Sequence, residues 1–189
     1  MRSKPILFSA PMVQAILAGR KMMTRRVVKP QPIRKPVECG WVPSGWSIES
    51  EPNEYGVKGC DCIEVKCPYE IGDRLWVRET WRGCDEDFPN LSYRADCTGS
   101  VIPKGWKPSI FMPRWASRIT LEVTDVRVER LQEITEADAI AEGFRATQNE
   151  RGEGSSATCW FRHLWEKLNG EKHPWSANPW VWIISFTKA

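Results

Sequence analysis

The sequence predicts an α+β fold, a small mixed β-barrel with a few helices around it. The prediction rests on two stretches of alternating apolar and polar residues, an apolar run at 180–187, and segments with helical periodicity. At 189 residues the chain has the length of one domain, enough to bury a core without disulfides or metal ions. We therefore expect a single domain over residues 1–189.

The first elements are a short strand and a helix. Residues 4–9 (KPILFS) have the composition of a strand, and Pro11 then opens a helix that ends at Gly19. The octet GRKMMTRR at 19–26 follows at once. We expect this octet to lie on the helix exit and in the loop after it.

A second strand is predicted at 72–80, GDRLWVRET, where a turn is followed by alternation. Its inward row contains Leu75, Val77 and Glu79. A carboxylate in an apolar row needs a cation or a hydrogen-bond donor, or it becomes protonated. We expect Lys21 to be the cation that pairs with Glu79.

Two further strands are predicted in the C-terminal half. Residues 118–130 form a long strand whose apolar row slips at Thr124 and Asp125, which indicates a β-bulge or a bend. The run WVWIISFT at 180–187 starts apolar on both faces, so we place it in the centre of the sheet.

Helices are predicted between these strands. Thr135 and Asp138 form a capping box that starts a short helix ending at Gly143. A stronger helix covers about 157–169, with a wide apolar face.

Two segments, approximately 30–66 and 82–113, are irregular and read as surface insertions. The first contains or adjoins Cys39, Cys60, Cys62 and Cys67, whose spacing lacks the paired C-x2-C typical of zinc sites. We therefore expect no metal, and reduced cysteines that act as small buried hydrophobic residues.

Charge is distributed unevenly along the chain. The first 36 residues contain nine Lys or Arg and no Asp or Glu, whereas the remainder contains 18 basic and 24 acidic residues. This asymmetry favours a local patch for phosphate or nucleic acid, although a basic segment that is simply solvated would look the same. The N-terminal apolar run is too short for a signal peptide, so we expect a cytoplasmic protein with no membrane partner.

The octet at 19–26 fits the pattern G-x-K-x-x-T-x-R, complete at Gly19, Lys21, Thr24 and Arg26. With the strand GDRLWVRE and the closing NPWVWIISF, the chain resembles the ASCH family, which has a PUA-like β-barrel fold. The arrangement is similar to the longer ASCH proteins of bacteriophages and prophages. The resemblance implies RNA binding, or hydrolysis of N4-acetylcytidine without a cofactor.

The resemblance also implies a catalytic set, which here falls on Lys21, Thr24 and Glu79. Hydrolysis of an exocyclic N-acyl group needs a base, donors for the oxyanion and an acid for the leaving amine. Neighbouring arginines and burial would lower the pKa of Lys21, whereas pairing with Glu79 would raise it. The sequence leaves open whether Lys21 is a neutral base or a charged group that polarises the acyl oxygen, and whether Thr24 attacks or positions water.

The partner expected from these features is a modified nucleoside or RNA, with no obligate protein partner. Aromatic rings could stack on a base, and polar or cationic groups could contact its phosphate or carbonyl groups. The expected substrate-binding residues are Phe8, Ser9, Arg26, Arg114, Trp115 and Arg118.

Other functions fit the same sequence. A non-catalytic RNA-binding module would use the same basic patch. A ribonuclease could recruit a divalent metal with the acidic cluster at 85–87. An assembly protein of a phage particle would keep the octet only as a signature of the fold. In each case a Lys21–Glu79 ion pair could be purely structural.

Overall fold

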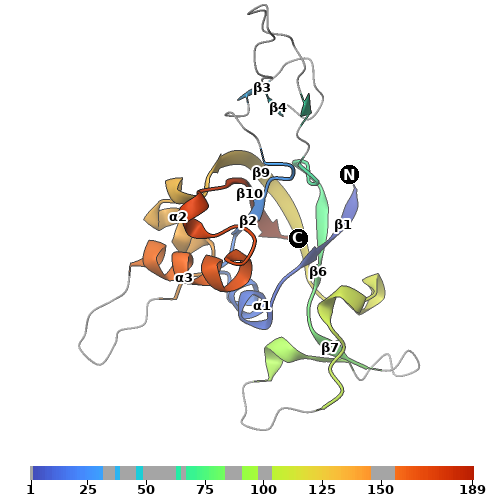
Figure 1. The fold of residues 1–189 in the computed structure, drawn as a ribbon. Helices are drawn as coiled ribbons and strands as arrows, with labels where there is room; N and C mark the ends of the chain where they lie inside the picture. The colour runs from blue at the N-terminus through green and yellow to red at the C-terminus, as the bar shows by residue number, and fades with distance from the viewer. Residues whose placement is uncertain are drawn as a thin grey trace, which may run out of the picture.

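A computed structural model of the chain describes residues 2–31, 37–38, 46–48, 63–64, 67–83, 91–97, 104–145 and 156–189. Its main element is a mixed five-stranded sheet (Figure 1). The strands follow the order β1 (Ser3–Leu7), β6 (Arg74–Arg78), β9 (Thr120–Arg130), β10 (Trp180–Lys188) and β2 (Met23–Val27). The β1–β6 pair is parallel, and the other three pairs are antiparallel.

The two ends of this strand order approach each other through a side chain. Arg26 on β2 donates a hydrogen bond from Nη2 to the carbonyl oxygen of Leu7 on β1, at 2.7 Å. The structure shows a mixed sheet with flanking helices, as expected, and does not show the closed barrel that the sequence predicts.

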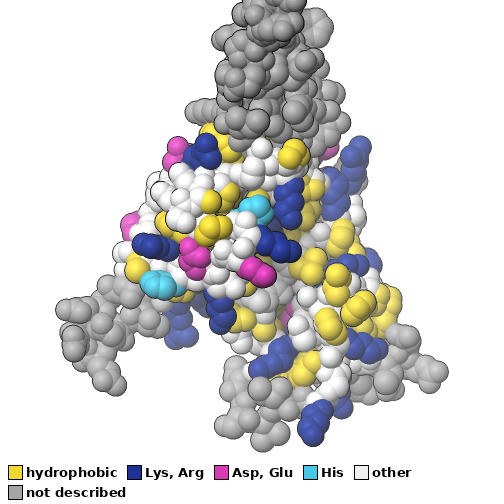
Figure 2. Space-filling view, viewed as in Figure 1, with side chains coloured by type: hydrophobic (Ala, Val, Ile, Leu, Met, Phe, Trp, Pro, Cys, Tyr) yellow, Lys and Arg dark blue, Asp and Glu magenta, His cyan; other side chains and the backbone are white. Residues whose placement is uncertain are grey.

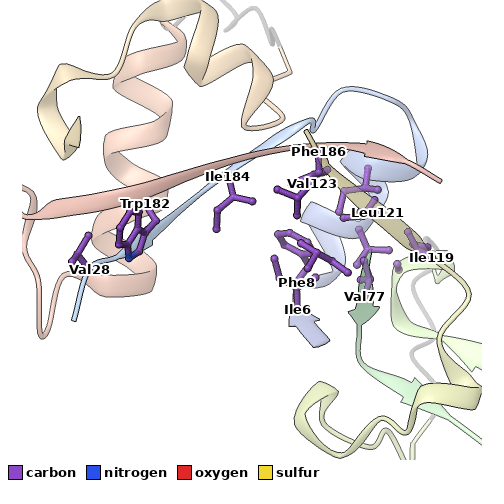
Figure 3. Close-up of a cluster of buried hydrophobic side chains, with 14 of the residues drawn as sticks. Ile6, Phe8, Val28, Val77, Ile119, Leu121, Val123, Trp182, Ile184 and Phe186 are labelled. Carbon is purple, nitrogen blue, oxygen red and sulfur yellow. The ribbon is translucent and has the colours of Figure 1, made fainter. Parts of the chain in front are cut away.

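Strand β10 contributes to the two larger hydrophobic clusters, which explains why its sequence is apolar on both faces. Trp182, Ile184 and Phe186 pack into the larger cluster, and Figure 3 shows them with the side chains of β1, β6 and β9. Val181 and Ile183 point to the opposite face and pack against residues of the helices. The central position predicted for this strand is confirmed, because β10 pairs with β9 on one side and β2 on the other.

The predicted bulge is also confirmed. Ser185 pairs with Asp125, but the next residue of β10, Phe186, pairs with Val123. Thr124 is therefore the extra residue of β9, and its insertion lets the apolar row continue on the inner face.

Within the described residues, three α-helices flank the sheet: α1 (Ala10–Leu17), α2 (Glu136–Ala141) and α3 (Ala157–Asn169). The Thr135 hydroxyl accepts from the backbone N–H of Asp138, and the Asp138 carboxylate accepts from the N–H of Thr135, as the predicted capping box requires. Helices α2 and α3 pack together, at the left in Figure 1, over the face of β10 that bears Val181.

The octet at 19–26 departs from its predicted loop. Gly19 does end the helical segment, with φ of 69°, but residues Met23–Val27 form strand β2. Strand β2 pairs with β10, for example Thr24 with Ile184. The polar sequence MTRRV has no strong strand pattern of its own, so pairing with an apolar neighbour decides its conformation.

Smaller elements surround the sheet. A three-stranded sheet within the first predicted insertion contains β3 (Val37–Glu38), β4 (Trp46–Ile48) and β5 (Ile63–Glu64). A hairpin of β7 (Trp81–Arg82) and β8 (Ser92–Tyr93) begins the second. Single-turn 3₁₀ helices are η2 (Arg94–Asp96), η3 (Ser109–Phe111), η4 (Arg114–Ala116), η5 (Leu131–Glu133) and η6 (Trp175–Ala177).

Some predicted features lie outside the described residues: Cys39, Cys60, Cys62 and the acidic cluster at 85–87. Among the residues that the structure describes, no helix is long and apolar enough to cross a membrane.

Candidate functional site

A cavity of about 800 Å³ opens beside the approaching ends of β1 and β2, with α3 and the segment after it as the facing wall. This volume lies towards the upper end of the range, about 300–1,000 Å³, for sites that bind small molecules. Figure 2 shows Lys and Arg side chains around a hollow on this face. Its polar lining includes Ser9, Thr24, Arg25, Arg26, Lys29, Thr80, Ser109, Glu142, Lys172 and His173.

Lys21 does not line this cavity and is almost completely buried. Its Nζ donates to Glu142 Oε2 at 2.6 Å, to the carbonyl oxygen of Glu142 at 2.9 Å and to that of Met23 at 2.8 Å. An ammonium group has three N–H donors, and all three are used here. Lys21 is thus held rigidly, while Glu142 and Thr24 lie on the cavity wall.

The carboxylate beside Lys21 is therefore Glu142, and the expected Lys21–Glu79 pair is wrong. Glu79 does lie on the inward row and is buried, as predicted. Its cation is Arg118, whose Nε and Nη2 donate to the two carboxylate oxygens at 2.9 and 3.2 Å. Arg118 lies just before β9, which pairs with β6, so the segment that leads into the neighbouring strand supplies this guanidinium.

Glu142 bridges two cations. Besides Lys21, its other oxygen accepts from Arg25 Nη1 at 3.4 Å, and Arg25 Nη2 donates to Asp138 at 3.0 Å. Arg25 and Glu142 are buried, so removal of one partner would leave an uncompensated charge, at a typical cost of about 3–5 kcal/mol. The two cations, Lys21 and Arg25, and the two carboxylates, Asp138 and Glu142, have a net formal charge of zero.

Backbone contacts place Glu142 against Lys21. The N–H of Met22 donates to the carbonyl of Ala141, and Lys21 and Glu142 form an isolated antiparallel bridge. The next residue, Gly143, has φ of 106°, and a Cβ there would lie 3.0 Å from Ala15 Cβ and 3.2 Å from Lys21 Cβ. Glycine therefore allows the end of α2 to approach the octet closely.

Burial shifts the two titratable groups in opposite directions. Desolvation lowers the pKa of Lys21, although the Glu142 carboxylate opposes that effect. Desolvation raises the pKa of Glu79, and the hydrogen bonds from Arg118 offset part of the increase. Burial thus opposes the charged form of each group, and the ion-pair partner of each group supports it.

The predicted substrate-binding residues divide into two groups. Phe8, Ser9 and Arg26 line the cavity, together with Thr24. However, Phe8 is a core residue rather than an open stacking surface, since it is 3% exposed and packs on Phe186. Lys21 Nζ and the Arg26 guanidinium also lie within 5.6 Å and 5.5 Å of its ring centre.

Arg114, Trp115 and Arg118 lie outside the cavity lining. Arg118 is engaged within the protein, because besides Glu79 it binds both oxygens of Asp96 at 2.7 and 2.9 Å. Arg114 and Trp115 are exposed on η4.

Sequence reasoning missed Glu142, yet the sequence contains a signal for it. Glu142 is the C-cap of α2, immediately before the terminating Gly143. A carboxylate at a helix C-terminus is electrostatically unfavourable because the unpaired carbonyl groups there carry partial negative charge. A glutamate at that position therefore indicates a nearby cation, which here is Lys21.

No group of three or more potential metal ligands occurs within the described ranges.

In comparisons with known proteins, no protein-family model and no curated protein matches the chain. One solved structure that it resembles is the crystal structure of an ASCH domain from Lactobacillus crispatus JV V101. The match has 12% identity and a TM-score of 0.47, and covers 99% of this chain and 79% of that chain. At 12% identity, no residue role can be transferred between the two chains.

Proposed function

We propose that the protein acts on a modified nucleoside or RNA and hydrolyses the acyl group from the exocyclic amine of N4-acylated cytidine. The observation that carries this proposal is the buried Lys21–Glu142 pair, whose carboxylate residue lines the same cavity as Thr24. The match of the octet to the ASCH pattern supports the substrate class.

In the proposed reaction, the Thr24 hydroxyl or a water molecule attacks the acyl carbon. The Lys21–Glu142 pair accepts the proton of the attacking oxygen and returns it to the exocyclic nitrogen as the C–N bond breaks. If Thr24 attacks, water then hydrolyses the acyl ester and regenerates the hydroxyl. Glu142 replaces Glu79 in this set, because Glu79 is bound to Arg118.

Two arginines of the cavity wall can stabilise the developing negative charge. The Nε groups of Arg25 and Arg26 are buried and have no hydrogen-bond partner within the described part of the protein. Because these atoms are closed to solvent, the charge of the two guanidinium groups, and not hydrogen bonds from Nε, would stabilise an oxyanion in the cavity. Both residues line the cavity.

The alternative is a non-catalytic module that binds RNA in the same cavity. The saturation of Lys21 by three acceptors favours this alternative, since a fully engaged ammonium group can serve only to fix Glu142 and β2. The hydrolase predicts turnover that depends on Glu142, whereas the binding module predicts affinity for RNA without turnover.

Two matched variants test the proposal: Glu142→Gln and Glu79→Gln. Both residues are buried and paired with a cation, but only Glu142 lines the cavity. With N4-acetylcytidine as substrate and cytidine release followed by chromatography, we expect kcat/KM to fall at least about 100-fold in Glu142→Gln. We expect Glu79→Gln to stay within a few-fold of wild type.

Thermal unfolding of both variants controls for loss of structure. Equal turnover of wild type and a folded Glu142→Gln variant would contradict the catalytic role of Glu142. A complete lack of turnover by the wild type, with retained affinity for RNA, would favour the binding module.

A further inference from the structure

The segment 104–118 combines cations with aromatic rings and contains no acidic residue. Its cations are Lys104, Lys107, Arg114 and Arg118, and its rings are Trp106, Phe111 and Trp115. Single-stranded nucleic acids bind to surfaces of this composition, because bases stack on aromatic rings and phosphates attract the cations. Arg118 is bound to Glu79 and Asp96, so the other three cations are the relevant ones.

This segment forms one lip of the cavity. Ser109 lines the cavity beside Leu7 and Thr80, and η3 continues from Ser109 to the outer surface. Arg78 Nη1 donates to the carbonyl oxygen of Ile110 at 3.1 Å and holds η3 against β6. A chain that leaves the cavity across Ser109 therefore reaches Ile110 and Phe111 directly.

The outer side of the lip is apolar and exposed. Ile110 is 58% exposed, Phe111 72% and Trp115 40%, and we call these three residues the outer platform. Beneath them, Trp81, Met112 and Ala116 form a small buried cluster, and the Trp115 ring meets Trp81 edge-on at 5.8 Å. The platform is thus anchored on a packed base while its hydrophobic side chains remain in contact with solvent.

Two cations of this segment lie over tryptophan rings of β6 and β7. Lys107 Nζ lies 4.7 Å from the ring centre of Trp81, and the Arg114 guanidinium lies 5.9 Å from that of Trp76. Figure 2 shows Lys and Arg side chains next to hydrophobic ones at the lower right of this face. Positive charge beside exposed apolar groups suits a base with its phosphate better than an uncharged apolar surface of another protein.

We propose that the substrate is a single-stranded nucleic acid, in which one base enters the cavity and a neighbouring nucleotide stacks on the outer platform. Lys107 and Arg114 would contact the phosphate group that links these two nucleotides. This inference rests on the proposed function only in that the cavity receives a nucleotide. A free nucleoside would have no contact with the platform.

The test compares Phe111→Ala with Ile71→Ala. Both residues are exposed hydrophobic side chains, but Ile71 lies in the turn before β6, whereas the platform lies beyond the other end of that strand. The probe is a fluorescent single-stranded RNA of about ten nucleotides, within the usual site sizes, with one N4-acetylcytidine at its centre. Fluorescence anisotropy gives Kd, and size-exclusion chromatography gives the oligomeric state.

We expect Kd to rise about tenfold in Phe111→Ala and to be unchanged in Ile71→Ala. Equal affinities for the two variants, or no binding by the wild type, would overturn the proposal. Unchanged RNA affinity with a change of oligomeric state in Phe111→Ala would also overturn it, and would assign the platform to a protein contact.

Deacetylation of the N4-acetylcytidine within this RNA probe by the wild type tests the proposed hydrolysis separately. Without such turnover, RNA binding that depends on Phe111 would refute the hydrolase and still support the strand-binding platform.

Discussion

At the scale of single residues, the site depends on which carboxylate meets Lys21. Glu79 and Glu142 are both buried glutamates with a cationic partner, so burial and ion pairing do not distinguish them. Only Glu142 shares its cavity wall with Thr24. In the proposed function, Glu142 therefore takes the role that the sequence suggests for Glu79.

Thr24 offers a direct test at this scale. Its hydroxyl is the proposed nucleophile or water-positioning group, so Thr24→Val should lower kcat at least about 100-fold. Valine has nearly the same shape and favours strands, so we expect little loss of folding stability in β2. Thr24→Ser, which keeps a hydroxyl, should retain part of the activity. Steady-state hydrolysis of N4-acetylcytidine checks both variants, and full activity of Thr24→Val would exclude a role for the hydroxyl.

At the scale of elements, the close approach of α2 to the octet assembles the site. The capping box begins α2 at a fixed residue, six residues later the helix ends, and its C-cap Glu142 reaches Lys21. The helix and its caps were predictable because they depend on residues close in sequence. The contact with Lys21 was not, because residues 121 apart in sequence meet only when the sheet and α2 are both in place.

Gly143→Ala should disturb this approach. The added methyl group would crowd Ala15 and Lys21, and alanine is strained at φ of 106°. We expect a loss of about 1–3 kcal/mol in the free energy of unfolding, together with reduced turnover. Urea denaturation measures the stability.

Gly105→Ala is the matched control for Gly143→Ala. Gly105 also has positive φ, at 87°, but a Cβ there meets no atom within 4 Å. Gly105→Ala should cost about 1–2 kcal/mol, from backbone strain alone. Equal losses in the two variants would mean that crowding at Gly143 is unimportant.

At the scale of the whole molecule, basic residues from distant segments meet around one cavity. Lys29 follows β2 and Lys172 follows α3, and both line the cavity. The charge asymmetry of the sequence predicted a local patch near the N-terminus. The contribution of Lys172 could not be predicted, because the position of α3 over the sheet depends on the packing of Phe161 and Trp165 against Val181 and Ile183.

Salt dependence tests this arrangement of charge. If Lys29 and Lys172 each contact a phosphate, Lys29→Gln and Lys172→Gln should each reduce the slope of log K against log salt concentration by about one. Lys188→Gln, at the end of β10 and outside this cavity, should leave the slope unchanged. RNA-binding titrations at several salt concentrations measure the slopes, and identical slopes for all three variants would argue against phosphate contacts at the cavity.

The sequence alone determined the local elements: the helix stop at Gly19, the capping box at Thr135, the bulge at Thr124 and the central apolar strand β10. Each of these depends on the conformational preferences or periodicity of neighbouring residues. The tertiary structure decided the pairing of MTRRV as strand β2, the partner of Lys21 and the formation of the cavity. The physical reason is that strand pairing and buried ion pairs gain free energy from groups that are distant in sequence, and only the packed fold brings such groups together.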